Sequence, residues 1–170
     1  MHTPILFEEI QHFRQKWFWW LMIAMNAFLI TGFFANAFIH HEVNNDTSAG
    51  LLTAIFVIAI ITLLLHHSGM VTQVRSDGIY VKVMPFHSSF KFFSWHSIDQ
   101  VYIRTYNPIT EYGGWGMRHT LNGVAFNVTG NIGLQLVFNN GAKLLIGTQQ
   151  PEQLAAALII LGKLTPPPAL

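Results

Sequence analysis

Two long runs without a charged side chain constrain this chain more than any other feature. They cover residues 17–39 and 49–65. A helix over the first run would be about 35 Å long, against about 30 Å for the hydrocarbon core of a bilayer. Helices that are apolar all round can also be buried in a large soluble core, but only about 105 residues follow the second run. The pattern therefore predicts a transmembrane helical hairpin over residues 17–67.

The positions of Lys and Arg predict how such a hairpin would be oriented. Arg14 and Lys16 precede the first run, and Arg75 and Lys82 follow the second, whereas residues 40–48 contain neither Lys nor Arg. Because basic residues accumulate on the cytoplasmic side of membrane helices, both termini are expected in the cytoplasm. We therefore expect a protein integral to the inner (plasma) membrane.

The segment before the first run carries signals for a helix start. Thr3 is a suitable N-cap and Pro4 suits the first helical position. Its apolar members are Ile5, Leu6, Phe7, Ile10 and Phe13. This spacing predicts an interfacial helix over residues 1–16, with a simple extension of the first span as the alternative.

After residue 67 the apolar pattern changes to a period of two. Residues 79–84, 101–106 and 134–139 alternate between apolar and other side chains, as strands with one buried face do. Turn signals such as Asn122-Gly123 separate these segments. Six or seven short strands at this spacing predict a small antiparallel sandwich or barrel.

The period changes again near the end of the chain. Pro151 suits a first helical position, and the apolar stripe that follows is formed by Leu154, Ala157, Leu158 and Leu161. We expect this amphipathic helix to close the β domain, which then covers residues 70–164. The proline-rich residues 165–170 are expected to form a flexible tail.

Composition narrows the classes of function. The chain is 51% hydrophobic and 10% charged, and its net charge of +1 is too small for a groove that neutralises many phosphates, so no nucleic-acid partner is expected. The absence of cysteine excludes disulfides and thiolate chemistry. Asp77, Asp99 and Glu152 each suit a turn or a helix start, and they form no acid–base pair, so we do not expect an enzyme.

Histidine is the one composition signal for a metal or haem site. The pairs at residues 40–41 and 66–67 would lie at opposite mouths of the hairpin, so they could not share an ion. We therefore expect interfacial histidines, with no metal and no cofactor.

Several motifs support a family resemblance. Two predicted membrane helices, short strands and a closing helix look like the bacterial membrane proteins that carry a pleckstrin-homology-like (PH-like) domain. The motifs that carry a narrower resemblance, to an uncharacterised bacterial family of this type, are Phe13-Arg14-Gln15, Tyr112-Gly113-Gly114-Trp115-Gly116-Met117-Arg118, Phe126-Asn127-Val128-Thr129-Gly130 and Ile146-Gly147-Thr148-Gln149-Gln150-Pro151-Glu152. The resemblance implies an α+β membrane protein, with a transmembrane hairpin before a small antiparallel PH-like β-barrel or sandwich. It implies no activity.

A glycine-rich segment around one tryptophan is the predicted binding site. Glycines allow close approach of another chain, and the indole offers a large apolar face with one donor. The candidate binding residues are Tyr112, Gly113, Gly114, Trp115, Gly116 and Arg118. The alternative is that the glycines shape a turn and Trp115 fills the core.

Two binding functions remain open. The first is a membrane-anchored interaction or scaffolding module that binds an unidentified membrane or cytoplasmic protein, or its own copies as a homo-oligomer. The alternative is a module for lipid headgroups at the inner leaflet. Its candidate residues are Lys82, Lys91, Arg104, Lys143 and Arg118. Convergence of three or more of these side chains on one pocket would favour the lipid hypothesis.

Overall fold

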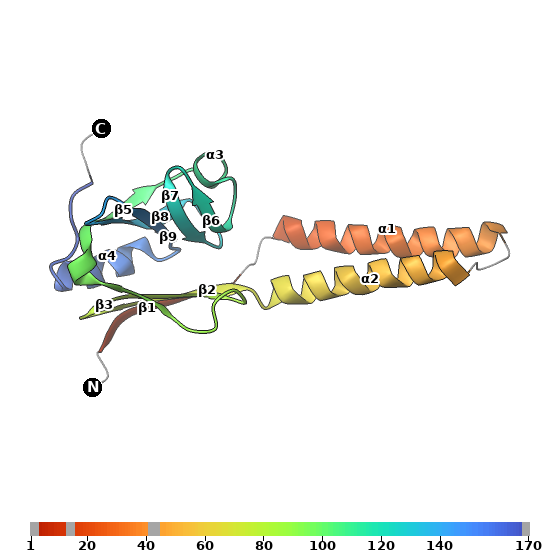
Figure 1. Ribbon diagram of the computed structural model, residues 1–170, viewed down its shortest axis with the longest axis horizontal. Coiled ribbons are helices and arrows are strands. Elements are labelled where there is room, and N and C mark those ends of the chain that lie inside the picture. Colours follow the sequence, from red (N-terminus) through yellow and green to blue (C-terminus); the bar gives the residue numbers. More distant parts are fainter. Residues whose placement is uncertain (1–3, 13–15, 41–44, 168–170) are drawn as a thin grey trace. The chain divides into compact units, whose positions relative to one another are not determined.

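The computed structural model describes residues 4–12, 16–40 and 45–167. The chain divides into two compact units, each described here by itself. One unit contains residues 1–13 and 68–170 and holds all the strands, and the other contains residues 14–67 and holds two long helices (Figure 1).

The first sheet contains the N-terminal segment as a strand. Its order is β1-β2-β3-β4, formed by β1 (Ile5–His12), β2 (Gly69–Arg75), β3 (Gly78–Met84) and β4 (Lys91–Ser94). All neighbours are antiparallel, and Glu9 of β1 lies opposite Thr72 of β2. The interfacial helix predicted over residues 1–16 is therefore wrong for residues 5–12. Long-range pairing with β2 outweighs the local helix signals, as tertiary context often does.

The second sheet has the order β5-β8-β9-β7-β6. Its strands are β5 (Ile98–Thr105), β6 (Gly116–Thr120), β7 (Gly123–Asn127), β8 (Ile132–Phe138) and β9 (Lys143–Gly147). The pair β7 and β9 is parallel and the other neighbours are antiparallel. Two short helices follow strands of this sheet, namely α3 (Pro108–Tyr112) after β5 and α4 (Pro151–Ile160) after β9.

One apolar core joins the inner faces of the two sheets. Its fully buried members include Met70, Ile79, Leu134 and Leu136. Helix α4 lies beside the two sheets (Figure 1) and adds its apolar stripe to the same core, with Leu158 fully buried. A 3-10 turn over Trp95–Ser97 links the sheets, and the Trp95 indole N–H donates to the Arg75 carbonyl at 3.0 Å.

The second unit consists of α1 (Lys16–His40) and α2 (Asn45–His66). The Trp19 and His66 rings lie 5.6 Å apart in an edge-to-face contact, which joins the start of α1 to the end of α2. Several apolar side chains face outward, including Phe28 at 77% exposure and Phe34 at 65%. In water, exposed apolar side chains in such number indicate a surface that another apolar surface covers.

The predicted transmembrane hairpin is contradicted. Neither α1 nor α2 has the combined length and apolarity needed to cross a membrane, and the same holds for the other helices of the described residues. The prediction rested on the absence of charge, which is a weaker criterion than apolarity sustained along a whole span. The predicted fold class of an α+β membrane protein, the membrane assignment and the inner-membrane location are therefore wrong. The fold consists of two largely antiparallel sheets and a few helices.

The tail predicted to be flexible is partly fixed. Thr165 is bonded to the edge of β5, since its backbone N–H donates to the Val101 carbonyl at 2.7 Å and its hydroxyl accepts from the Val101 N–H at 3.0 Å. These bonds cover part of an open strand edge. Residues 168–170 lie outside the described part of the chain.

Candidate binding site

Helix α3 lies on the outer face of the second sheet and is well defined by its ends. The Asn107 side chain accepts hydrogen bonds from the backbone N–H groups of Ile109 and Thr110, and Pro108 occupies the first turn. Gly113 ends the helix in the left-handed conformation, at φ 72°. These are the residue types that favour a helix start and a helix end.

Tyr112 holds α3 against the sheet. It is 2% exposed and forms a small cluster with Tyr106, Ala125 and Leu145. The Tyr106 and Tyr112 rings meet edge to face, with centres 5.9 Å apart. Tyr112, predicted as a binding residue, is therefore a core residue.

Arg104 is the centre of a polar network beside α3. Its Nε donates to Gln135 Oε1 at 3.0 Å, and its Nη2 donates to Glu111 Oε2 at 2.8 Å and to the Tyr112 hydroxyl at 3.2 Å. The remaining guanidinium nitrogen lies 3.4 Å from the Thr105 carbonyl. With its donors used in this way, Arg104 fixes α3 to the sheet and has little capacity left for a ligand.

The Arg104 and Glu111 pair shifts both pKa values. Burial alone would lower the pKa of Arg104, but the hydrogen bond and charge of Glu111 outweigh it and raise that pKa. Burial alone would raise the pKa of Glu111, but its bonds to Arg104 and to the Asn107 N–H outweigh it and lower that pKa. Both groups are therefore charged at neutral pH, and their charges cancel.

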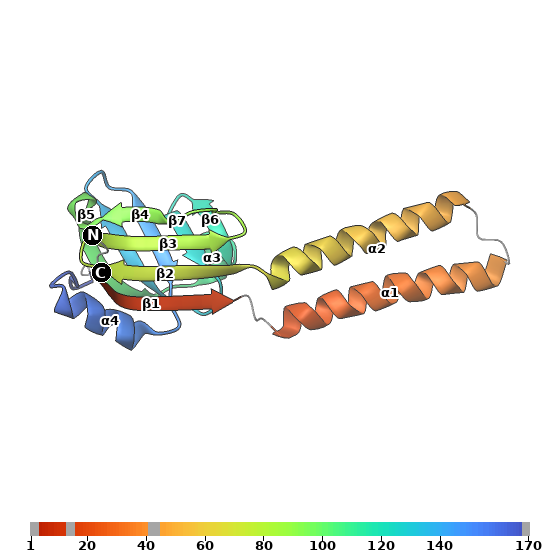
Figure 2. The same ribbon diagram turned by 90° about the horizontal axis from the view of Figure 1, so that it is seen from below.

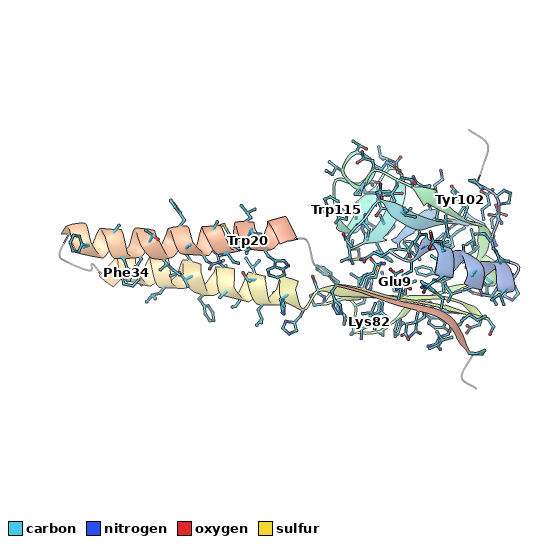
Figure 3. The ribbon with its side chains drawn as sticks, turned by 180° about the vertical axis from the view of Figure 1, so that it is seen from behind. Glu9, Trp20, Phe34, Lys82, Tyr102 and Trp115 are labelled. Atoms are coloured by element: carbon cyan, nitrogen blue, oxygen red, sulfur yellow. The ribbon has the colours of Figure 1, made fainter. Side chains whose placement is uncertain are left out.

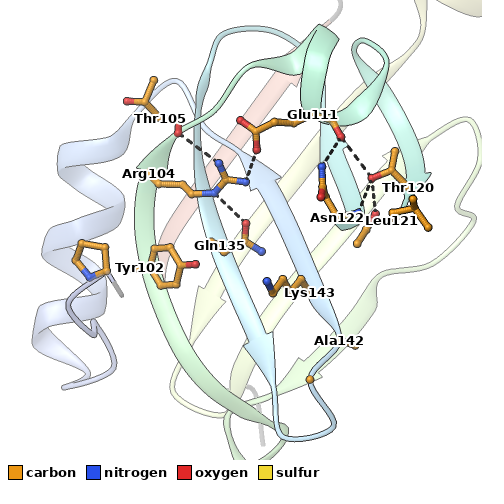
Figure 4. A pocket seen from close by; sticks show the side chains of 13 residues that line it. Tyr102, Arg104, Thr105, Glu111, Thr120, Leu121, Asn122, Gln135, Ala142 and Lys143 are labelled. Atoms are coloured by element: carbon orange, nitrogen blue, oxygen red, sulfur yellow. Dashed lines mark hydrogen bonds and ion pairs between the residues drawn. The ribbon is translucent and has the colours of Figure 1, made fainter. Parts of the chain in front are cut away.

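A hollow of about 780 Å³ opens beside this network; we call it the α3 hollow. It is lined by Tyr102, Arg104, Thr105, Glu111, Thr120, Leu121, Asn122, Gly123, Gln135, Gly141, Ala142, Lys143 and Pro167. Tyr102 on β5 and Lys143 on β9 point toward one another across β8 (Figure 4). The side chain of Lys143 has no hydrogen-bond or ion-pair partner among the described residues, so its charge is the uncompensated one in the hollow.

The turn between β6 and β7 forms the far rim of the hollow. The Asn122 side chain donates to the Glu111 carbonyl at 3.2 Å, and the Thr120 hydroxyl lies 3.4 Å from the same oxygen. These contacts tie the turn to α3. Leu121 at the tip of the turn is fully exposed, so the rim presents an apolar side chain to solvent.

The predicted glycine-tryptophan site does not line this hollow. Trp115 is half-buried, and its indole N–H donates to the Gly130 carbonyl at 3.1 Å, while Arg118 donates to the Trp115 carbonyl at 3.1 Å. The three glycines at 113, 114 and 116 have positive φ angles of 72°, 119° and 110°. The segment forms the connection between α3 and β6, and Trp115 is labelled in Figure 3.

The basic residues of the lipid hypothesis are divided between the two sheets. Arg104 and Lys143 line the α3 hollow, whereas Lys82 lies on β3 (Figure 3) and Lys91 on β4. The Lys91 ammonium lies 5.5 Å from the centre of the Phe126 ring. Two of these side chains share a pocket, fewer than the three that would favour a lipid headgroup.

Sequence reasoning missed most of the residues that line the hollow. Tyr102 and Gln135 occupy outward positions on strands that are predicted from a period of two. This period could have placed both residues on one outer face of the sheet. No three His, Asp or Glu side chains lie together as a metal site among residues 4–12, 16–40 and 45–167.

These features define a two-sheet β domain that contains an inserted helical hairpin and carries the polar α3 hollow. The chain belongs to a family described as Family of unknown function (DUF6141), whose model matches residues 1–162. The expectation of an uncharacterised family is therefore confirmed. No curated protein and no solved structure matches the chain.

Proposed function

We propose that this chain is a binding module that holds an acidic segment of a protein partner in the α3 hollow. The observation that carries this proposal is the pair formed by Lys143 and Tyr102, which point toward one another in a hollow whose other cation is already neutralised. We include in this proposal a PH-like character of the β domain, which is supported by its two sheets and the C-terminal helix that follows them.

The donors suit a single carboxylate. Lys143 offers an ammonium group with three donors, and Tyr102 adds a hydroxyl. Bonds from an ammonium group to a carboxylate are short and stronger than neutral ones. Arg104 and Glu111 cancel, so one positive charge remains, which matches one carboxylate better than a headgroup that carries several phosphates.

The rim of the hollow suits a protein segment. The volume of the hollow falls within the usual range of about 300–1,000 Å³ for binding pockets. Leu121 is fully exposed at the rim, where an apolar side chain beside the acidic residue would cover it. A partner with an acidic residue next to an aliphatic one therefore fits both features.

The experiment is a titration of the full-length, nitrogen-15-labelled chain with a blocked peptide of sequence Gly-Leu-Glu-Leu-Gly, followed by NMR. We expect shifts at the amides of Leu121, Gln135 and Lys143. The variant Lys143→Gln should weaken the peptide Kd about fivefold or more, because it removes the uncompensated charge. The matched control Lys91→Gln removes a lysine of equal charge from the other sheet and should leave the Kd unchanged.

Two further arms separate the possible ligands. A peptide with Gln in place of Glu should bind as weakly as the acidic peptide binds the Lys143→Gln variant. Inorganic phosphate and short-chain phosphatidylglycerol should shift the same amides less than the acidic peptide does. Stronger binding of either phosphate compound would overturn the protein-segment proposal in favour of a headgroup, and an acidic peptide that leaves these amides unshifted would remove it altogether.

A further inference from the structure

The outward face of the first sheet is open. Figure 2 views this sheet directly, and within its own unit neither a helix nor another strand of the described chain lies over it. We call it the open face. An uncovered sheet face that carries large apolar side chains is typical of an interaction surface.

The open face has two chemically different halves. On β1 the outward side chains include Leu6, Glu8 and Ile10, with exposures of 36% for Leu6 and 58% for Ile10. On β3 and β4 they include Tyr80, Lys82 and Phe92, and the Tyr80 and Phe92 rings have centres 4.7 Å apart. One half is therefore aliphatic and acidic, and the other is aromatic and basic.

A row of contacts across the sheet fixes part of this face. Gln73 donates to Glu8 Oε1 at 2.6 Å and accepts from Arg75 Nη2 at 2.6 Å, and the Arg75 guanidinium lies 4.6 Å from the centre of the Tyr80 ring. Glu8 Oε2 accepts no hydrogen bond from the described residues. The side chain of Lys82 likewise has no hydrogen-bond or ion-pair partner among them. One acid and one base therefore remain available, in opposite halves of the face.

We propose that two copies of this chain associate through their open faces, with Glu8 of each copy paired to Lys82 of the other. A two-fold axis parallel to β2 lays β1 of one copy over β3 of the second. Each acidic, aliphatic half then covers a basic, aromatic half. Two-fold dimers are the commonest oligomers, and packed sheets lie about 10 Å apart, within reach of these long side chains.

The charges of the face favour a second copy over other partners. Glu8 and the nearby Asp77 balance Arg75 and Lys82, so the face has no net charge. A nucleic acid or an anionic surface would need an excess of positive charge. Separation of acid and base into two halves gives a surface that complements itself when it is rotated.

The chain has no cysteine, which permits a direct cross-linking test. Val71 is half-buried on the outward face of β2 and lies near the proposed axis. Purified full-length Val71→Cys should form covalent dimers with a bismaleimide that spans about 10 Å, the spacing of packed sheets. The matched control Asp99→Cys places an exposed cysteine on β5 and should remain monomeric. Equal cross-linking of both variants would overturn the proposal.

Charge reversal separates this contact from association through any other surface. In the Val71→Cys background, Glu8→Lys and Lys82→Glu should each weaken dimerisation about tenfold, because two ion pairs become repulsive in a two-fold dimer. The double variant should restore it. Unchanged cross-linking in the single variants, or a double variant as weak as the singles, would contradict the proposal.

One variant checks the same contact without touching the hydrogen-bonded row. Ile10→Lys changes an exposed side chain, so circular dichroism should report an intact fold. It should nevertheless reduce cross-linking about tenfold, because Ile10, Val71 and Lys82 lie at one level across the sheet, so the proposed axis lays residue 10 of one copy over Lys82 of the other, where a second lysine repels it. A folded Ile10→Lys variant that cross-links normally would refute the open face as the interface. The test is independent of the α3 hollow, since none of these residues lines it.

Discussion

Replacement of Glu9 by Gln should destabilise the β domain markedly, although the two side chains have nearly the same size and shape. Glu9 is 3% exposed, and its carboxylate accepts hydrogen bonds from the Thr148 hydroxyl and from the Gln149 backbone N–H, both at 2.7 Å. These residues directly precede α4, whose N-cap Gln150 makes no side-chain capping bond of its own. Glu9, a strand residue near the start of the chain, therefore fixes the two residues that lead into α4, and the Thr148 hydroxyl in turn accepts from the Gln150 N–H at 3.0 Å.

The size of the effect follows from these contacts. A hydrogen bond to a charged group contributes about 1.5–3 kcal/mol, and a carboxylate near a helix N-terminus gains about 0.3–1 kcal/mol more. Glu9→Gln retains one acceptor but turns its amide N–H₂ toward a donor. We therefore expect a loss of about 2–3 kcal/mol, and about 3–5 kcal/mol for Glu9→Ala, which leaves both donors buried without an acceptor.

Hydrogen exchange measured by mass spectrometry is the suitable assay, because it reports β1 and α4 separately from the helical hairpin. Peptides from both elements should exchange faster in Glu9→Gln by a factor that corresponds to this free energy. The matched control is Glu152→Gln, which removes an exposed acid from the first turn of α4 and should cost at most about 1 kcal/mol. Equal effects of the two substitutions would show that only the charge near the helix matters, and would refute the argument that Glu9 fixes the segment before α4.

Three further predictions concern the second sheet. Because the pKa of Glu111 is lowered from 4.5, its ion pair stabilises the fold above that pH and the contribution is lost as the pH falls below it; Glu111→Gln should cost about 1 kcal/mol at pH 7 and progressively less as the pH falls below 4.5, measured by urea unfolding. Trp115→Phe should leave the chain folded and lower its unfolding free energy by about 1 kcal/mol through loss of the bond to Gly130; a fully unfolded variant would contradict this. Gly123→Ala should cost about 2 kcal/mol or more in thermal unfolding, because a side chain at φ 113° would collide with the backbone of β9, whereas Gly141→Ala has open space and should cost about 1 kcal/mol. Equal costs for the two glycines would show that the collision is relieved.

The N-terminal strand shows why part of the fold could not be predicted from sequence. Strands with an apolar inward face, such as β3 and β8, are visible as a period of two, and both were predicted. In β1 the inward residues are Phe7, Glu9 and Gln11, and two of these three are polar. The hydrogen-bond partners of Glu9 and Gln11 lie at residues 147–149, more than 130 positions along the chain. The burial of this face therefore depends on contacts that the sequence around β1 does not reveal.

The candidate site was only partly predictable for a similar reason. The segment from 112 to 118 is predicted as a binding site because glycine and tryptophan are conspicuous, yet its tryptophan is fixed to a neighbouring loop. The hollow is assembled from outward positions on β5, β8 and β9, which are far apart in the sequence. Among the residues that line it, the sequence predicts only Arg104 and Lys143 as binding residues, and it predicts them for a lipid headgroup.

The place where the helical hairpin enters the β domain has a consequence for tolerance to change. The hairpin leaves after β1 and returns at β2, and His12 pairs directly with Gly69. The two ends of the inserted segment are therefore held one strand spacing apart, about 5 Å, as are the ends of an ordinary tight turn. The segment with α1 and α2 therefore connects β1 to β2 in the same way as a short turn connects two neighbouring antiparallel strands. Insertions and deletions within it can accumulate without shifting the register of any strand, so evolution can vary the length of this part of the chain independently of the β domain.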